Sequence, residues 1–181
     1  DFSGYTDIAR GIARFLGVEL IQNFACPYFS RNITEFWRRW HMSLSSWLRD
    51  YLYISLGGNK KGKTRTNINL MTTMLLGGLW HGANWTFIVW GGLHGLFLAV
   101  HKFLLKGKKI DINSWGNNQL GYLNDFVGII LTFHLVCLAW IFFRAPSFSV
   151  AYMYIKGIFL NGGNVTFLKP VLLGLISMIL I

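Results

Sequence analysis

The sequence predicts an all-α, multi-pass integral membrane protein that also carries short or re-entrant helices and amphipathic helices at the membrane interface. Of its 181 residues, 53% are hydrophobic and 13% are charged, whereas soluble domains carry about 25% charged residues. One uncharged run covers the 36 residues 66–101. Basic residues cluster between the apolar runs, so the net charge of +10 indicates loops beside anionic lipid headgroups. Nucleic-acid binding is not expected.

The first two segments are predicted to be amphipathic helices. Residues 2–17 place Asp7 and Arg10 three positions apart, where they can pair on one helix face. Between residues 33 and 52, apolar side chains recur at steps of one, three or four, which predicts one or two helices beginning near Thr34. Tryptophan and arginine alternate in this stretch, and both favour the headgroup layer of a membrane.

The long uncharged run predicts two helices. The sequence HGANW at 81–85 is a natural break, so we expect one helix over 67–81 and a second over 84–105. A helix of about 14 residues reaches only about 21 Å, which is less than the hydrocarbon thickness of about 30 Å. His81 is therefore expected to lie inside the depth of the membrane.

Residues 126–143 predict a third span, and a fourth begins near Val165. The basic loop 57–67 and the loop 106–125 fall on one side of an antiparallel helix pair, and the positive-inside rule makes that side cytoplasmic. The chain has no initiator methionine and stops within an apolar run. We therefore expect residues 1–181 to be the middle-to-C-terminal part of a larger membrane domain, truncated at both ends.

The histidines are the strongest candidates for catalytic residues. His81 is an ionisable group at membrane depth, where such groups usually mark a pathway or a site. Glycines at 77, 78 and 82 let neighbouring backbones approach it closely. His41 lies between Trp37 and Leu44 at helical spacing and should border the buried face, as a hydrogen-bonded core residue or as a catalyst. Cys26 and Cys137 have no disulfide or metal spacing and are expected to pack.

Two blocks carry a family resemblance. NFACPYFSRNITEFWRRWHMSLSSWLRDYLYISLGG, followed by LLGGLWHGANWTFIVWGGLHG, resembles the membrane-bound O-acyltransferase family in its bacterial alginate O-acetyltransferase-like branch. DFSGYTDIARG at the start and WIFFRA at 140–145 fit the same branch. The resemblance covers residues 1–145.

The resemblance implies a function and two site residues. Members move an acyl group from a cytoplasmic-side thioester, acyl-CoA or an acyl carrier, to hydroxyls of an extracytoplasmic polysaccharide such as alginate, or to a periplasmic or membrane-anchored partner transferase. His81 stands where the family has its catalytic histidine, and His41 matches the second polar site residue. No bound cofactor or metal is implied. The expected location is the inner membrane.

Acyl transfer to an alcohol needs a base for the hydroxyl proton, and imidazole suits that task near neutral pH. We therefore expect His81 to be the general base and His41 to orient the acceptor or donate to the oxyanion. Two alternatives remain open on the residues alone. His81, His94 and His101 in apolar helices are also typical of haem ligation. A pore-forming or export subunit would line its channel with the same polar residues. His94, His101 and His134 are otherwise expected to be packing or cavity-lining residues.

Overall fold

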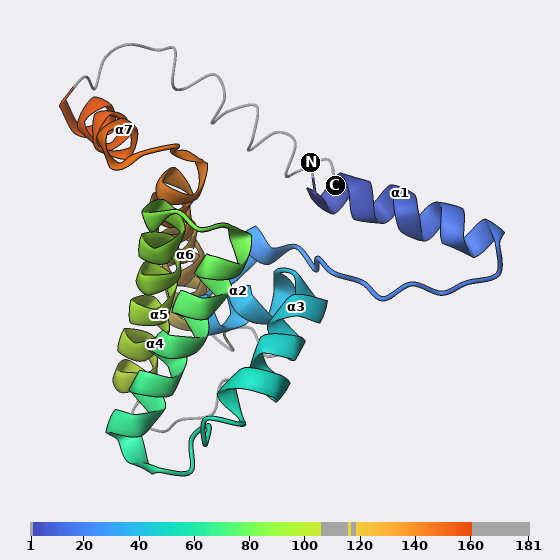
Figure 1. Cartoon of the computed structure of the whole chain (residues 1–181), viewed down its shortest axis with the longest axis horizontal. Coiled ribbons are helices and arrows are strands. Elements are labelled where there is room, and N and C mark those ends of the chain that lie inside the picture. Colours follow the sequence, from blue (N-terminus) through green and yellow to red (C-terminus); the bar gives the residue numbers. More distant parts are fainter. Residues whose placement is uncertain (1, 106–115, 117–118, 161–181) are drawn as a thin grey trace.

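The computed structural model describes residues 2–105, 116 and 119–160, and every regular element in those ranges is a helix. Figure 1 shows α4, α5 and α6 side by side, with the shorter helices against them and α1 extending away. The α-helices are α1 (Phe2–Phe15), α2 (Ile33–Arg39), α3 (Met42–Trp47), α4 (Gly62–His81), α5 (Trp85–Leu105), α6 (Gln119–Arg144) and α7 (Phe148–Leu160). Two short elements, η1 (Pro27–Phe29) and η2 (Leu48–Tyr53), are a 3-10 and a π-helix.

Helices α4 and α5 form the predicted antiparallel hairpin, and the break falls at residues 82–84 as expected. The predicted start of α4 is wrong: the helix begins at Gly62, not 67, and has 20 residues. It therefore reaches about 30 Å, because the polar residues after Gly62 continue the helix and the Thr66 hydroxyl bonds the Gly62 carbonyl oxygen at 2.9 Å. Helix α4 is therefore not the short helix that was expected. Because the depth of His81 in the bilayer was inferred from a short helix, that depth stays a prediction.

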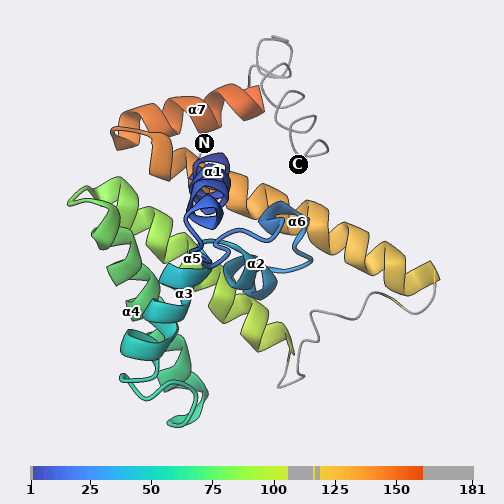
Figure 2. The same cartoon turned by 90° about the vertical axis from the view of Figure 1, so that its right-hand side faces the viewer.

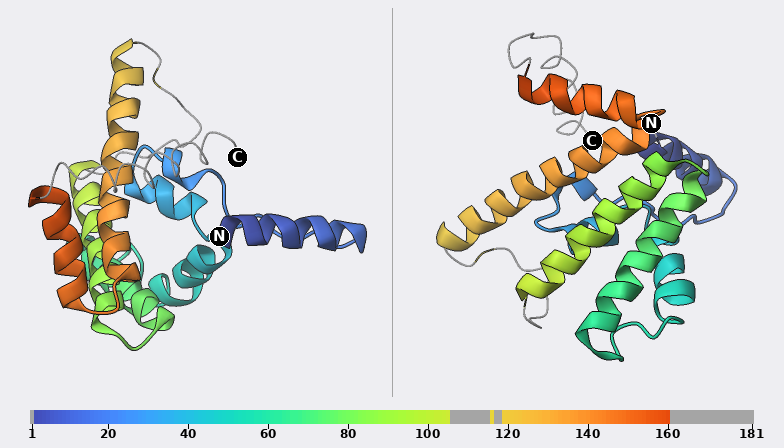
Figure 3. Two further views of the ribbon diagram at one scale, coloured as in Figure 1. Left: turned by 90° about the horizontal axis from the view of Figure 1, so that it is seen from above. Right: turned by 60° about the vertical axis from the view of Figure 1, so that its left-hand side comes forward.

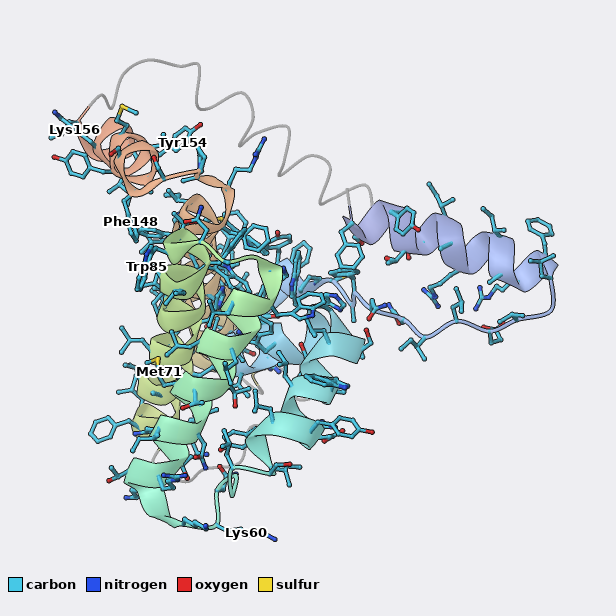
Figure 4. The ribbon with its side chains drawn as sticks, in the orientation of Figure 1. Lys60, Met71, Trp85, Phe148, Tyr154 and Lys156 are labelled. Atoms are coloured by element: carbon cyan, nitrogen blue, oxygen red, sulfur yellow. The ribbon has the colours of Figure 1, made fainter. Side chains whose placement is uncertain are left out.

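Two of the described helices, α5 and α6, are long and apolar enough to cross a membrane. Figure 4 places Lys60 and Trp85 at opposite ends of the hairpin. The Lys102 ammonium near the end of α5 donates to the side-chain oxygen of Asn59. The basic stretch before α4 and the last turn of α5 therefore lie together, as the topology prediction requires, while the loop at 106–115 lies outside the described residues.

Glycines allow α4 and α5 to pack backbone against backbone. A Cβ on Gly78 would lie 2.3 Å from the carbonyl oxygen of Phe87, and one on Gly91 would lie 2.3 Å from that of Met74. A methyl group at either position would clash with backbone atoms, which cannot move aside as a flexible side chain can. The close backbone approach predicted from Gly77, Gly78 and Gly82 is confirmed for Gly78, and Gly91 supplies the matching surface on α5.

Gly91→Ala is therefore expected to destabilise the hairpin by at least about 1–3 kcal/mol, the usual cost of overpacking. Thermal unfolding of the detergent-solubilised protein measures the effect. Gly92→Ala is the matched control, since a Cβ there meets only a side-chain carbon of Leu75 at 3.6 Å. Equal melting temperatures for the two variants would refute the close backbone packing.

The interfacial stretch forms three short helices, α2, α3 and η2, rather than the predicted one or two. Asn32, not Thr34, caps α2, because its side-chain oxygen accepts from the Glu35 backbone N–H at 2.9 Å. The helix ends at Arg39, and the chain turns at Trp40 and His41 before α3. Figure 2 shows α2 and α3 beside the long helices.

A buried ion cluster fixes α2, and the sequence reasoning missed it. The Glu35 carboxylate is 0% exposed and accepts from the Arg39 guanidinium at 2.6 Å and from that of Arg31 at 3.0 Å. Arg31 also pairs with Asp125 of α6 at 3.6 Å. The spacing Arg31, Glu35, Arg39 repeats every four residues, which is the signal that predicts such pairing on a helix.

The remaining helices agree with the predictions to different degrees. Helix α1 forms as predicted, with Arg10 and Asp7 paired at 3.7 Å. Helix α6 contains the predicted span 126–143 and begins seven residues earlier, at Gln119. Helix α7 was not predicted, and Figure 3 shows it near the end of α6. The fourth span expected from Val165 lies outside the described residues.

Candidate active site

His41 occupies a backbone conformation that few residues other than glycine adopt. Its φ of 42° and ψ of 60° lie in the left-handed region, where His, Asn and Asp are enriched among non-glycine residues. This turn ends α2 and begins α3, so it points the imidazole away from the path of a continuous helix. The predicted helical spacing around His41 is therefore wrong, although its predicted place at the border of the buried face is confirmed.

The segment before α2 holds this turn in place. The backbone N–H groups of Ala25 and Met42 bond the carbonyl oxygens of Arg39 and Asn23, each at 3.0 Å. The Asn23 side-chain oxygen accepts from the backbone N–H and the hydroxyl of Ser43, at 3.1 and 2.7 Å. These bonds satisfy the backbone groups released by the helix break and offset the strain of the left-handed residue.

His81 is the last residue of α4, and aromatic rings surround its imidazole. The rings of Trp80, Trp90 and Phe143 lie 5.0, 5.2 and 5.0 Å away, each close to perpendicular. These neighbours come from α4, α5 and α6. The hairpin and the third long helix therefore fix the orientation of the imidazole together.

The two predicted site residues meet at one cavity. His41 and His81 both line it and lie within electrostatic reach of each other. The cavity volume is about 10 Å³, which is room for roughly one water molecule. Apart from the two imidazoles and tryptophan N–H groups, its walls are aliphatic or aromatic. The lining residues are Trp37, Trp40, His41, Leu44, Leu48, Met74, Gly77, His81 and Trp90.

Burial lowers the pKa of His41 below its ordinary value of 6.5, because desolvation disfavours the charged imidazolium. The neutral form therefore persists as the pH falls through 6.5 and is lost only at more acidic pH. A protonated His41 would place a positive charge beside His81 and weaken it as a proton acceptor. We expect acyl transfer to decline with an acid midpoint below about 6.5, measured as initial rates between about pH 5 and 8. A midpoint above that value would contradict a buried neutral pair.

The other histidines lie elsewhere. The ring of His94 is enclosed by aromatic side chains, His101 Nδ1 lies 2.9 Å from the Thr34 hydroxyl, and His134 Nδ1 lies 2.7 Å from the Ile130 carbonyl oxygen. Because neither His94 nor His101 lines the cavity at His81, the geometry does not support haem ligation by these three residues. Within the described ranges, no three His, Cys, Asp or Glu side chains gather in a way that could hold a metal ion.

Sequence reasoning missed the tryptophans as parts of the site. Trp37, Trp40 and Trp90 form much of the cavity wall, and Trp40 also stacks on Phe36 at 5.6 Å. The sequence interpretation placed the tryptophans of the interfacial stretch at the headgroup layer. Their alternation with arginines hid the fact that Trp37 packs against Trp90 and His94 of α5.

The sequence matches known proteins over the elements that build this cavity. Residues 2–119 match the model of MBOAT, the membrane-bound O-acyltransferase family. The chain is 51% identical over 151 residues to the probable alginate O-acetylase AlgI of Pseudomonas syringae pv. tomato, covering 83% of this chain and 27% of that protein.

Two further relatives are named for different activities. The peptidoglycan O-acetyltransferase of Helicobacter pylori is 43% identical, over 90% of this chain and 29% of that protein. The teichoic acid D-alanyltransferase of Bacillus subtilis is 33% identical, over 82% and 38%. The chain thus spans less than two fifths of the length of these relatives. Because the family model matches residues 2–119, which include both cavity-lining histidines and the α4–α5 hairpin, the chain belongs to the membrane-bound O-acyltransferase family.

Proposed function

We propose that the protein is a multi-pass enzyme of the inner membrane that transfers an acyl group, most simply acetyl, from a cytoplasmic-side thioester to a hydroxyl group. The acceptor is an extracytoplasmic polysaccharide or a partner transferase. The observation that carries the proposal is that His41, from the turn between α2 and α3, and His81, at the end of α4, line one small and otherwise apolar cavity. The relatives are named as acetyl and D-alanyl transferases, which supports the reaction class.

The proposed reaction assigns one role to each imidazole. His81 accepts the proton of the acceptor hydroxyl as its oxygen attacks the thioester carbonyl carbon. His41 donates a hydrogen bond to the oxyanion that develops on the carbonyl oxygen. The carbon–sulfur bond then breaks, and the thiolate takes the proton from His81. An ester and a free thiol are the products, so atoms and charge balance.

The cavity suits this chemistry because it limits water. A thioester in bulk water is exposed to hydrolysis, and a closed apolar site reduces that side reaction. The cavity has room for about one water molecule. The acyl group can therefore enter only if the side chains that line the cavity move. The basic residues Lys60, Lys61 and Lys63 precede or begin α4, on the side predicted to be cytoplasmic. They are placed to attract a phosphate-bearing donor.

The proposal is tested by supplying acetyl-CoA with a labelled acetyl group to membranes that contain the protein and following the label. Transfer of label into polysaccharide or a partner protein is expected, with free thiol released in equal amount. Membranes with the protein but no transfer from acetyl-CoA or an acetylated carrier protein would contradict the proposal. A haem-binding protein would instead show a Soret absorption band after purification.

A further inference from the structure

His94 is a buried imidazole that the proposed reaction does not use. It lies on α5, one helical turn after Trp90, and is 0% exposed. Neither of its ring nitrogens has a hydrogen-bond partner among the described residues. A buried polar group without a partner is costly and rare in folded proteins. A phenylalanine would fill the same space without that cost, so the nitrogen atoms need an explanation.

Four aromatic rings form a box around His94. Phe36 lies parallel to the imidazole, at 6.0 Å and 7°. Trp90 and Trp37 lie closer, at 4.9 and 5.1 Å, in edge-to-face orientation, and Phe97 completes the box at 6.1 Å. The ring planes of His94 and Trp90 stand 68° apart, so the imidazole edge, which carries the N–H, can point at the indole face. An N–H group directed at an aromatic face makes a weak but favourable contact.

Two walls of this box are also walls of the cavity. Trp37 and Trp90 both line it. Trp90 contacts His94 at 4.9 Å and His81 at 5.2 Å, so one indole touches both imidazoles. His94 itself does not line the cavity. Any effect it has on the reaction must therefore pass through the tryptophans.

We propose that His94 is a positioning residue of this site, whose ring N–H donates to the indole face of Trp90 and so keeps Trp90 against His81. The inference rests on the proposed function, because the position of His81 matters most when His81 is the base. It gives a reason for a buried imidazole where a phenyl ring would pack as well.

The first test compares three variants in membranes of the host cell. His94→Phe keeps a ring but loses the N–H, and we expect turnover to fall about 10-fold, the scale of a modest misplacement of a catalytic group, with KM for the donor unchanged. His94→Gln retains an N–H of similar reach and should restore most of the rate. His134→Phe is the matched control on another long helix and should behave as the wild type. Full turnover in His94→Phe would overturn the proposal.

A double-mutant cycle with Trp90→Phe separates positioning from packing. If His94 acts through Trp90, adding His94→Phe to Trp90→Phe should lower turnover no further. If the double variant instead loses turnover by the product of the two single losses, His94 only supports the fold, and the proposal is overturned. If His94→Phe fails to accumulate, His94→Leu, which also lacks an N–H, takes its place in the cycle.

The second test does not depend on enzymatic activity. In protein labelled with ¹⁵N-histidine, the His94 ring proton is assigned by its loss in His94→Gln. An N–H above an indole face should resonate upfield of an ordinary imidazole N–H and move when Trp90 is changed to Phe. A downfield, hydrogen-bonded resonance that ignores Trp90→Phe would overturn the inference. If only the proposed function is wrong, the wild type will show no acyl transfer but will keep the upfield resonance.

Discussion

Replacing His81 by glutamine is expected to lower acyl transfer about 10²–10⁴-fold, the usual contribution of a positioned base. Glutamine keeps a polar side chain of similar length at the end of α4, but it cannot accept the hydroxyl proton. The ring contacts to Trp90 and Phe143 are lost as well, so protein abundance must be measured beside the rate. The assay follows labelled acetyl from the thioester into the acceptor in isolated membranes.

The control for this variant is His134→Gln. His134 lies on α6, its Nδ1 is 2.7 Å from the Ile130 carbonyl oxygen, and it does not line the cavity. The His134→Gln variant should leave acyl transfer unchanged. Near-normal transfer by His81→Gln at normal abundance would remove His81 as the base, whatever the role of His41.

Replacing His41 by asparagine is expected to reduce transfer about 10²-fold, comparable with the loss of one oxyanion donor. Asparagine is chosen because it tolerates the left-handed backbone that His41 adopts, with φ of 42°. The variant therefore removes the imidazole while the turn between α2 and α3 is kept. The same labelled-acetyl assay measures the effect.

His41→Ala serves as the comparison, since alanine lacks the imidazole and also resists the left-handed conformation. It should lose the same activity and additional thermal stability. If His41→Asn transfers acetyl within a few-fold of the wild type, His41 is a packing residue, and the pairing of two imidazoles has no catalytic meaning.

Periodicity predicted the parts of the fold that local sequence determines. The uncharged run broke at residues 82–84, because Gly82 and Asn84 interrupt a helical pattern that resumes at Trp85. The apolar span of α6 was equally plain. Helix α7 was missed because its apolar pattern is short and is interrupted by Lys156 and Gly157. A hydroxyl at Ser147, which accepts from the Val150 backbone N–H at 3.4 Å, was its only start signal.

The features that depend on tertiary contacts were harder to predict. A helical pattern gives no sign that the chain turns at His41, because the turn is held by Asn23 and Ala25, many residues earlier. The family resemblance identified His41 and His81 as candidates, but nothing in a spacing of 40 positions requires them to meet. Their common cavity arises because the buried cluster at Glu35 fixes α2 while glycines draw α4 and α5 together.

The central claim is that the space between His41 and His81 is where the acyl group reacts, and filling that space tests it most directly. Gly77 lines the cavity, and a Cβ there would lie 3.3 Å from Leu48 Cδ1. Gly77→Leu therefore extends into the cavity without changing either imidazole. Gly92→Leu is the matched control on α5, because its Cβ meets only Leu75.

The measurement is transfer of labelled acetyl at equal protein abundance. We expect Gly77→Leu to lose at least about 10-fold, since even a small displacement of reacting groups has that effect, while Gly92→Leu keeps its activity. Equal transfer by Gly77→Leu and the wild type would contradict the account, because the acyl group would then react somewhere other than between the two histidines.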